Sequence, residues 1–139
     1  MTPIGLDPVA REVAAALRNA TISYSSVGNG RVRIPLPNEF GELEIGAIET
    51  IPNSVDSIVG LVGQPWHTHG DVLSAELGGN GHIDGIVRFV RAVFAGKYLL
   101  IEEQTVGQLP RKIILKDLDR YLKHLPIDAT YRIYWPIAA

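Results

Sequence analysis

Short β-prone segments separated by tight turns are the feature that most restricts how this 139-residue chain can fold. In the clearest case, residues 21–27 and 31–36 flank the turn signal Gly28-Asn29-Gly30, and apolar residues alternate with other residues along the second segment, RVRIPL. Short turns join antiparallel neighbours, whereas parallel strands need a long crossover connection. The pattern therefore predicts a mostly antiparallel sheet.

Further strands are expected where β-prone residues recur, at residues 42–50, 57–63, 97–103, 111–115 and 130–135. Residues 57–63 (SIVGLVG) are apolar at nearly every position, which predicts a central strand covered on both faces. Apolar residues recur instead at helical spacing in three segments, at residues 8–19, 83–94 and 117–125.

These elements predict an α+β fold in which a mostly antiparallel sheet of about six to seven strands carries about three helices packed on it. Asp7-Pro8 is typical of a helix start, and Gly96 is placed to end a helix in the left-handed conformation. No linker or repeat divides the chain, so we expect residues 1–139 to form a single domain.

Charge and composition exclude several classes of function. The chain has 13 Lys+Arg against 15 Asp+Glu, and a formal net charge of -2 offers no footprint for nucleic acid or anionic lipid. It has no signal-peptide pattern, and no apolar run nears the roughly 20 residues that span a bilayer. Without cysteine it has no disulfide, thiol nucleophile or Cys-type zinc site. We expect a cytoplasmic protein that binds neither nucleic acid nor membrane.

One segment, Trp66-His67-Thr68-His69-Gly70-Asp71, carries chemistry. On an extended backbone, residues i, i+2 and i+4 share a face, so His67, His69 and Asp71 would converge as a two-histidine, one-carboxylate metal site. In this interpretation the protein is a metal-dependent hydrolase or oxygenase, in which one divalent ion activates water.

Three metalloprotein patterns come close to this segment, and each departs from it. Metallo-β-lactamase-like hydrolases carry His-x-His-x-Asp-His, but Val72 stands at the last His and the chain is short for that fold. In JAMM-type metalloproteases the Ser and Asp that follow the His pair stand at other distances. Cupins need a nearer Glu than Glu76 and an all-β barrel. A metal ion is therefore assigned only in the alternative interpretation.

The same segment has two interpretations without a metal. In the structural one it is an exposed strand-to-loop connection, and Asp71 caps a turn or helix through residues 72–77. In the binding one, Trp66 is an apolar anchor for a protein partner, and His67, His69 and Asp71 form its polar rim. Elsewhere, His82 and the pair Glu102-Glu103 are expected to be solvated, and His124 to lie in the last turn of a helix.

The segment Trp66–Asp71, the apolar helix ending in Phe94-Ala95-Gly96-Lys97-Tyr98 and the hydrophobic strand after it resemble small bacterial α+β proteins of unknown function, some of which are similar to toxin-immunity proteins. The resemblance covers roughly the second half of the chain. It implies an antitoxin-like protein, without catalysis or cofactor, whose partner is a toxin-like protein.

The last predicted strand, TYRIYW at residues 130–135, is a second candidate interaction surface, either for a partner strand or for a homodimer. Taken together, the sequence favours a non-enzymatic protein-binding module. The metal-dependent enzyme that uses His67, His69 and Asp71 is the alternative.

Overall fold

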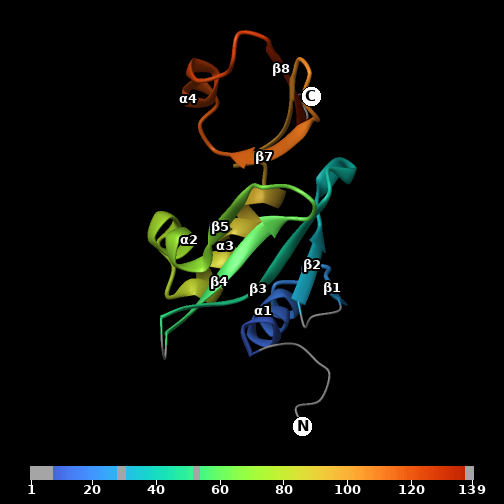
Figure 1. Ribbon diagram of the computed structural model, residues 1–139. Coiled ribbons are helices and arrows are strands. Elements are labelled where there is room, and N and C mark those ends of the chain that lie inside the picture. The colour runs from blue at the N-terminus through green and yellow to red at the C-terminus, as the bar shows by residue number, and fades with distance from the viewer. Residues whose placement is uncertain (1–7, 28–30, 52–53, 137–139) are drawn as a thin grey trace.

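The computed structural model describes residues 8–27, 31–51 and 54–136, and within them the chain folds into two antiparallel sheets and four α-helices (Figure 1). The first sheet has five strands in chain order: β1 (Ser25–Val27), β2 (Arg31–Pro35), β3 (Glu42–Ile51), β4 (Ser54–Leu61) and β5 (His67–His69). The second sheet has the order β7-β6-β8, with β6 (Leu99–Thr105), β7 (Arg111–Leu115) and β8 (Ala129–Trp135). The helices are α1 (Pro8–Asn19), α2 (Gly70–Leu77), α3 (His82–Phe94) and α4 (Leu118–Lys123), and a short 3-10 helix, η2, spans Pro37–Glu39.

The predicted α+β class and antiparallel pairing are confirmed, but the predicted strand and helix counts are wrong. The described residues contain eight strands in two sheets, where about six to seven strands in one sheet were expected. The sheets are separate because α2 and α3 follow β5, and β6 then pairs with β7 and β8. The additional helix is α2, which begins inside the Trp66–Asp71 segment. The predicted helix start at Asp7 and the predicted turn at Gly28-Asn29-Gly30 lie outside the described residues.

Strand alternation gives the five-stranded sheet one covered face and one open face. Apolar residues of β2, β3 and β4 stand opposite one another in two rows, Val32–Ile45–Val59 and Ile34–Leu43–Leu61, all buried. These rows share one core cluster with apolar residues of α1 and α3, such as Val13, Leu17, Ile86, Val90 and Val93. Residues one position along each strand must therefore lie on the opposite face.

β4 lies in the interior of the sheet, between β3 and β5, as expected for residues 57–63. Cover on both faces, however, was a wrong prediction. Ser57, Val59 and Leu61 are buried on the helix side, whereas Ile58 and Gly60 are only half-buried on the open side. An antiparallel sheet with helices on a single face allows this asymmetry.

The three-stranded sheet lies between the main core and α4, at the upper end of the molecule in Figure 1. On one face of this sheet, Leu100 and Ile114 belong to the core cluster. On its other face, the Tyr121 ring of α4 meets the Tyr131 ring of β8 edge-on, with centroids 5.9 Å apart. Trp135 anchors β8 to α3, since its Nε1–H donates to the Val93 carbonyl oxygen at 2.7 Å. No helix in the described residues is both long and apolar enough to cross a membrane.

Candidate functional site: a groove between the two sheets

A strand ends and a helix begins within the predicted metal motif. His67 and His69 lie on the short strand β5, on the same face, with ring centroids 5.6 Å apart. Helix α2 begins at the next residue, Gly70, so Asp71 lies in the first helical turn and is exposed. The extended backbone on which the three-ligand interpretation depended therefore ends at His69. Among the residues that the structure describes, no group of three or more His, Cys, Asp or Glu is placed to hold a metal ion.

Gly70, the first residue of α2, lies where the helix packs very closely on its neighbours. A Cβ on Gly70 would overlap the Ser57 hydroxyl and lie 2.6 Å from the His82 Cβ, so α2 approaches β4 and α3 more closely than a side chain permits. In the structural interpretation a turn or helix was expected through residues 72–77, and these residues belong to α2. The expected cap is wrong, because the capping position is His69, with no side-chain cap bond, and Asp71 lies within the first turn.

His82 was expected to be solvated, but it is the first residue of α3 and is half-buried, with its Nδ1 3.1 Å from the Ser57 Oγ. A serine and a histidine at this distance raise the question of a nucleophile and its base. Ser57 is fully buried beneath α2 and α3, however, and no external substrate reaches its hydroxyl in this structure. The pair therefore ties α3 to β4.

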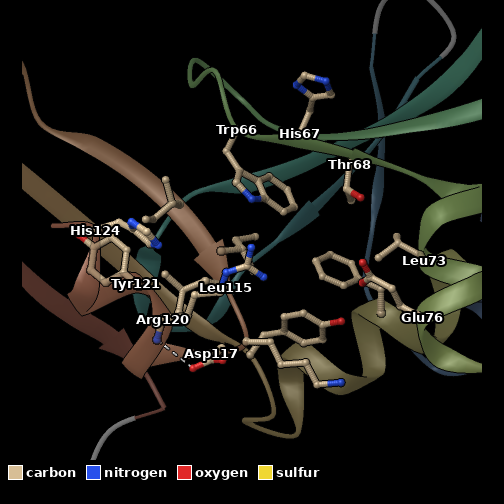
Figure 2. A pocket seen from close by; sticks show the side chains of 15 residues that line it. Trp66, His67, Thr68, Leu73, Glu76, Leu115, Asp117, Arg120, Tyr121 and His124 are labelled. Atoms are coloured by element: carbon tan, nitrogen blue, oxygen red, sulfur yellow. Dashed lines mark hydrogen bonds between the residues drawn. The ribbon is translucent and has the colours of Figure 1, made fainter.

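Trp66 and His67 point in opposite directions, as successive residues do along an extended strand. In Figure 2 the Trp66 ring and Thr68 point into a pocket, whereas the His67 ring points away from it. Trp66 stacks on Phe89 of α3, with centroids 6.1 Å apart and ring planes at 18°. Phe89 in turn meets Tyr98 edge-on at 4.9 Å. The three aromatic residues form a continuous apolar surface in the pocket.

This pocket, which we call the inter-sheet groove, has a volume of about 560 Å³ and lies between the two sheets. One wall comes from β5, α2 and α3, and the other comes from β7 and α4 (Figure 2). The first wall includes Trp66, Thr68, Leu73, Glu76 and Phe89, and the second includes residues 113–117, Arg120, Tyr121 and His124.

The two walls carry different charges. Glu76 is the acidic group of the α2 wall, while Lys116, Arg120 and His124 lie on the α4 wall. The Asp117 carboxylate caps the N-terminus of α4, because its Oδ1 accepts the Arg120 backbone N–H at 3.0 Å. His124 is the C-terminal cap residue of α4, close to the last-turn position expected for it.

Tyr98 is the polar group of the groove with an unmet hydrogen-bonding requirement. The residue is only 6% exposed, and within the described part of the chain its buried hydroxyl has no hydrogen-bond partner. Burial raises the pKa of this phenol, and the negative charge of Glu76 raises it further, so the hydroxyl remains protonated at neutral pH. Buried polar groups almost always have partners, so this exception needs an explanation.

Each sheet presents an edge strand to the groove, since β5 ends the five-stranded sheet and β7 ends the three-stranded one. Along the outer edge of β7, the Lys112 N–H donates to the Gln64 Oε1 at 2.9 Å. Backbone N–H and C=O groups alternate in direction along a strand. The N–H and C=O of Ile114 therefore point toward the same outer edge.

Glu103 was expected to be a solvated carboxylate, and that prediction is wrong. It is 7% exposed, its Oε2 pairs with Arg111 Nη2 at 3.0 Å, and its Oε1 accepts the Tyr121 hydroxyl at 2.8 Å. Burial, followed by the bond to Glu103, raises the pKa of Tyr121 well above its usual range. Glu103 therefore holds α4 and β7 against β6.

Comparisons of the chain with protein-family models, with curated proteins and with solved structures find no match. Of the four predicted binding residues, Trp66 lies in the groove and His67 at its rim facing outward, whereas His69 and Asp71 are not among the lining residues. Phe89, Tyr98 and β7 were not predicted as site residues. Phe89 follows the helical spacing of a core residue, and nothing local in the sequence shows that Tyr98 reaches the same place.

Proposed function

We propose that this chain is a non-enzymatic protein-binding module whose inter-sheet groove takes an extended segment of a partner protein. The observation that carries the proposal is the joint presence, in one groove, of an aromatic pocket and a strand edge that no other strand of the described residues pairs with. Segments that add a strand to a sheet edge gain affinity from backbone hydrogen bonds and specificity from side-chain pockets. This groove offers both.

The strand edge is that of β7. Ile114 directs its N–H and C=O outward, and a partner strand beside β7 would extend the three-stranded sheet to four strands. At Lys112 the outer edge is already bonded by the Gln64 side chain of the same chain, so a partner strand would pair from Ile114 onward. Edge strands that stay uncovered are liabilities that natural proteins usually block. An open edge beside a pocket therefore favours a binding role.

The pocket would receive one side chain of the same segment. Trp66 is half-buried, so its ring has surface left to contact a partner, and Phe89 and Tyr98 extend the apolar surface inward. Large aromatic residues are common among the residues that dominate binding energy. The unpartnered Tyr98 hydroxyl adds a donor that a small shift of the pocket on binding would offer to a partner's acceptor.

The resemblance to toxin-immunity proteins supplies the class of partner in this proposal, a toxin-like protein domain. The decisive test uses the toxin-like product of a neighbouring gene and asks whether co-expression of this chain suppresses its lethality. We expect suppression by the native chain and by Val72→Trp, which adds bulk on α2 at a residue 46% exposed and outside the groove lining. Thr68→Trp, which adds the same bulk inside the groove, should abolish it.

If the native chain does not suppress the toxin, the toxin-like partner is wrong. Suppression that survives Thr68→Trp would show that binding uses another surface. The thermal unfolding of both variants, measured alongside, separates a blocked groove from an unfolded protein.

A homodimer through β8 is the second candidate, and one observation favours it. β8 is the other edge of the three-stranded sheet, and it exposes Tyr131 and Ile133, which are 38% and 37% exposed. Sedimentation of the native chain and of a Tyr131→Lys, Ile133→Lys variant tests this candidate. A dimer that persists in the variant, or a native chain that is monomeric at high concentration, would remove it.

A further inference from the structure

The open face of the five-stranded sheet carries a second cavity, separate from the inter-sheet groove in its chemistry. Its volume is about 420 Å³, and its lining includes Arg31, Arg33, Glu44, Gly60 and His67. Four of these residues stand in one row across four strands, because Arg33 pairs with Glu44, Glu44 with Gly60, and Gly60 with His67. Along this row, Arg33 and Glu44 lie on one side of Gly60, and the His67 imidazole lies on the other side.

Two glycines keep the middle of this face free of side chains. A Cβ on Gly46 would lie 2.9 Å from the Arg31 Nη1 and 3.0 Å from its Cζ, so the guanidinium lies directly over the β3 backbone. A glycine within a strand weakens it, and often marks a place where another group approaches the backbone closely. At Gly46 that group is Arg31. Gly60, by contrast, lines the cavity, so no side chain from this position fills it.

Glu44 orients both arginines, but its single negative charge does not balance their two positive charges. Arg33 Nε lies 2.9 Å from Glu44 Oε2, and Arg31 Nε lies 3.9 Å from Glu44 Oε1. Among the residues that the structure describes, Glu44 is the one carboxylate paired with either arginine. Among the described side chains, two guanidinium groups therefore share one carboxylate, so the described charged residues that line the cavity, Arg31, Arg33 and Glu44, sum to a positive charge.

We propose that the open face binds a small oxyanion, such as a phosphate or carboxylate group, through Arg31 and Arg33 above Gly60. A guanidinium presents a rigid fork of donors that matches oxyanions, and both ion pairs with Glu44 use the Nε side of the fork. Glu44 fixes the two side chains and limits the affinity, because an incoming anion meets its negative charge. The two cavities share Trp66 and His67, but the arginines and the glutamate of this site lie on β2 and β3, outside the lining of the inter-sheet groove.

The test is a titration of the full chain with inorganic phosphate, and separately with acetate, followed by NMR at constant ionic strength held with chloride. The signals of Arg31, Arg33 and Gly60 should shift to saturation. Arg33→Gln should weaken binding about tenfold or more, because one charge-assisted contact is lost. Glu44→Gln should tighten it, because the competing carboxylate is gone.

Two controls make the outcome decisive. Arg88→Gln removes the same charge from α3, where Arg88 pairs with Asp84 at 2.8 Å, and should leave the binding constant unchanged. Gly60→Val fills the cavity floor without touching a charge and should abolish binding. It also serves in place of Arg33→Gln if that variant does not fold.

Saturation by either anion supports the site, and the comparison of the two identifies the preferred oxyanion. Equal weakening by Arg33→Gln and Arg88→Gln would show that the effect is general screening, and would overturn the proposal. Full affinity in Gly60→Val, or no saturable shift with either anion, would overturn it as well.

Discussion

Trp66 stacks on Phe89 with ring centroids 6.1 Å apart, and this contact joins the residue before edge strand β5 to the middle of helix α3. Phe89 is 1% exposed and belongs to the core, whereas Trp66 lies at the groove and is half-buried. The stacking therefore has two consequences. It fixes one wall of the inter-sheet groove, and it makes groove binding and fold stability depend on the same side chain.

Replacing Trp66 by alanine should lower the free energy of unfolding by about 2–3 kcal/mol, less than for a fully buried tryptophan because part of the ring is exposed. Urea denaturation followed by circular dichroism measures the change. Val72→Ala, at a residue 46% exposed on α2, is the matched control and should stay within about 0.5 kcal/mol of the native chain. A Trp66→Ala variant as stable as the control would contradict the stacking.

Removing the Tyr98 hydroxyl should stabilise the free protein. Tyr98→Phe keeps the ring contact with Phe89 and deletes a buried oxygen without a partner, so the free energy of unfolding should rise by about 1 kcal/mol. The same variant should bind the partner of the groove less tightly. Loss of stability in Tyr98→Phe would instead mean that the hydroxyl has a partner in the free protein.

Gly70, at the start of α2, and Gly60, on β4, should differ strongly in their tolerance of an added methyl group. Gly70→Ala would overlap the Ser57 hydroxyl and approach the His82 Cβ to 2.6 Å, so it should destabilise the fold by about 3 kcal/mol or more. Gly60→Ala meets its nearest atoms at 3.6 Å and 3.7 Å, which are ordinary contacts, and should change stability by less than about 1 kcal/mol. Thermal unfolding of the pair measures the difference, and similar midpoints would contradict the close approach of α2.

Asp84 should make stability fall in acid. The Asn80 backbone N–H and the Arg88 side chain both donate to its Oδ2, at 2.9 Å and 2.8 Å, and they hold the pKa of this carboxyl below its ordinary 3.8. A lowered pKa in the folded state means that the stabilisation is complete above the unfolded pKa. It is then lost as the pH falls through the folded pKa.

We therefore expect the unfolding midpoint to decline below about pH 4, the region of an ordinary carboxyl pKa, and to decline less steeply in Asp84→Asn. Asp119→Asn, which removes a carboxylate from α4, provides the charge-matched comparison. Parallel pH profiles for the native chain and Asp84→Asn would rule out this role of Asp84.

His67, His69 and Asp71 should not bind a stoichiometric divalent ion, because the strand ends at His69 and Asp71 belongs to α2. Metal analysis after incubation with zinc, manganese or iron, followed by desalting, checks this, with a His67→Ala, His69→Ala variant in parallel. One equivalent of metal in the native chain that disappears in the variant would restore the metal-dependent enzyme as the leading interpretation.

The sequence by itself determined the local elements. The helix predicted at residues 8–19 is α1, and the helical spacing from Ile83 to Phe94 falls within α3. Gly96 has φ +78 where a helix end was expected. Apolar alternation also predicted the two faces of β2. These features depend on residues within a few positions of one another, so hydrophobic period and glycine geometry are sufficient to identify them.

Only the tertiary structure decided how these elements divide into two sheets and what the Trp66–Asp71 segment does. The i, i+2, i+4 argument failed at Gly70, where the strand ends and α2 begins, packed closely against Ser57 and His82. The groove joins Trp66 to Tyr98 and to β7, which lie far along the chain. Such a site depends on which surfaces meet after the core has formed, and no periodicity within a single segment specifies that meeting.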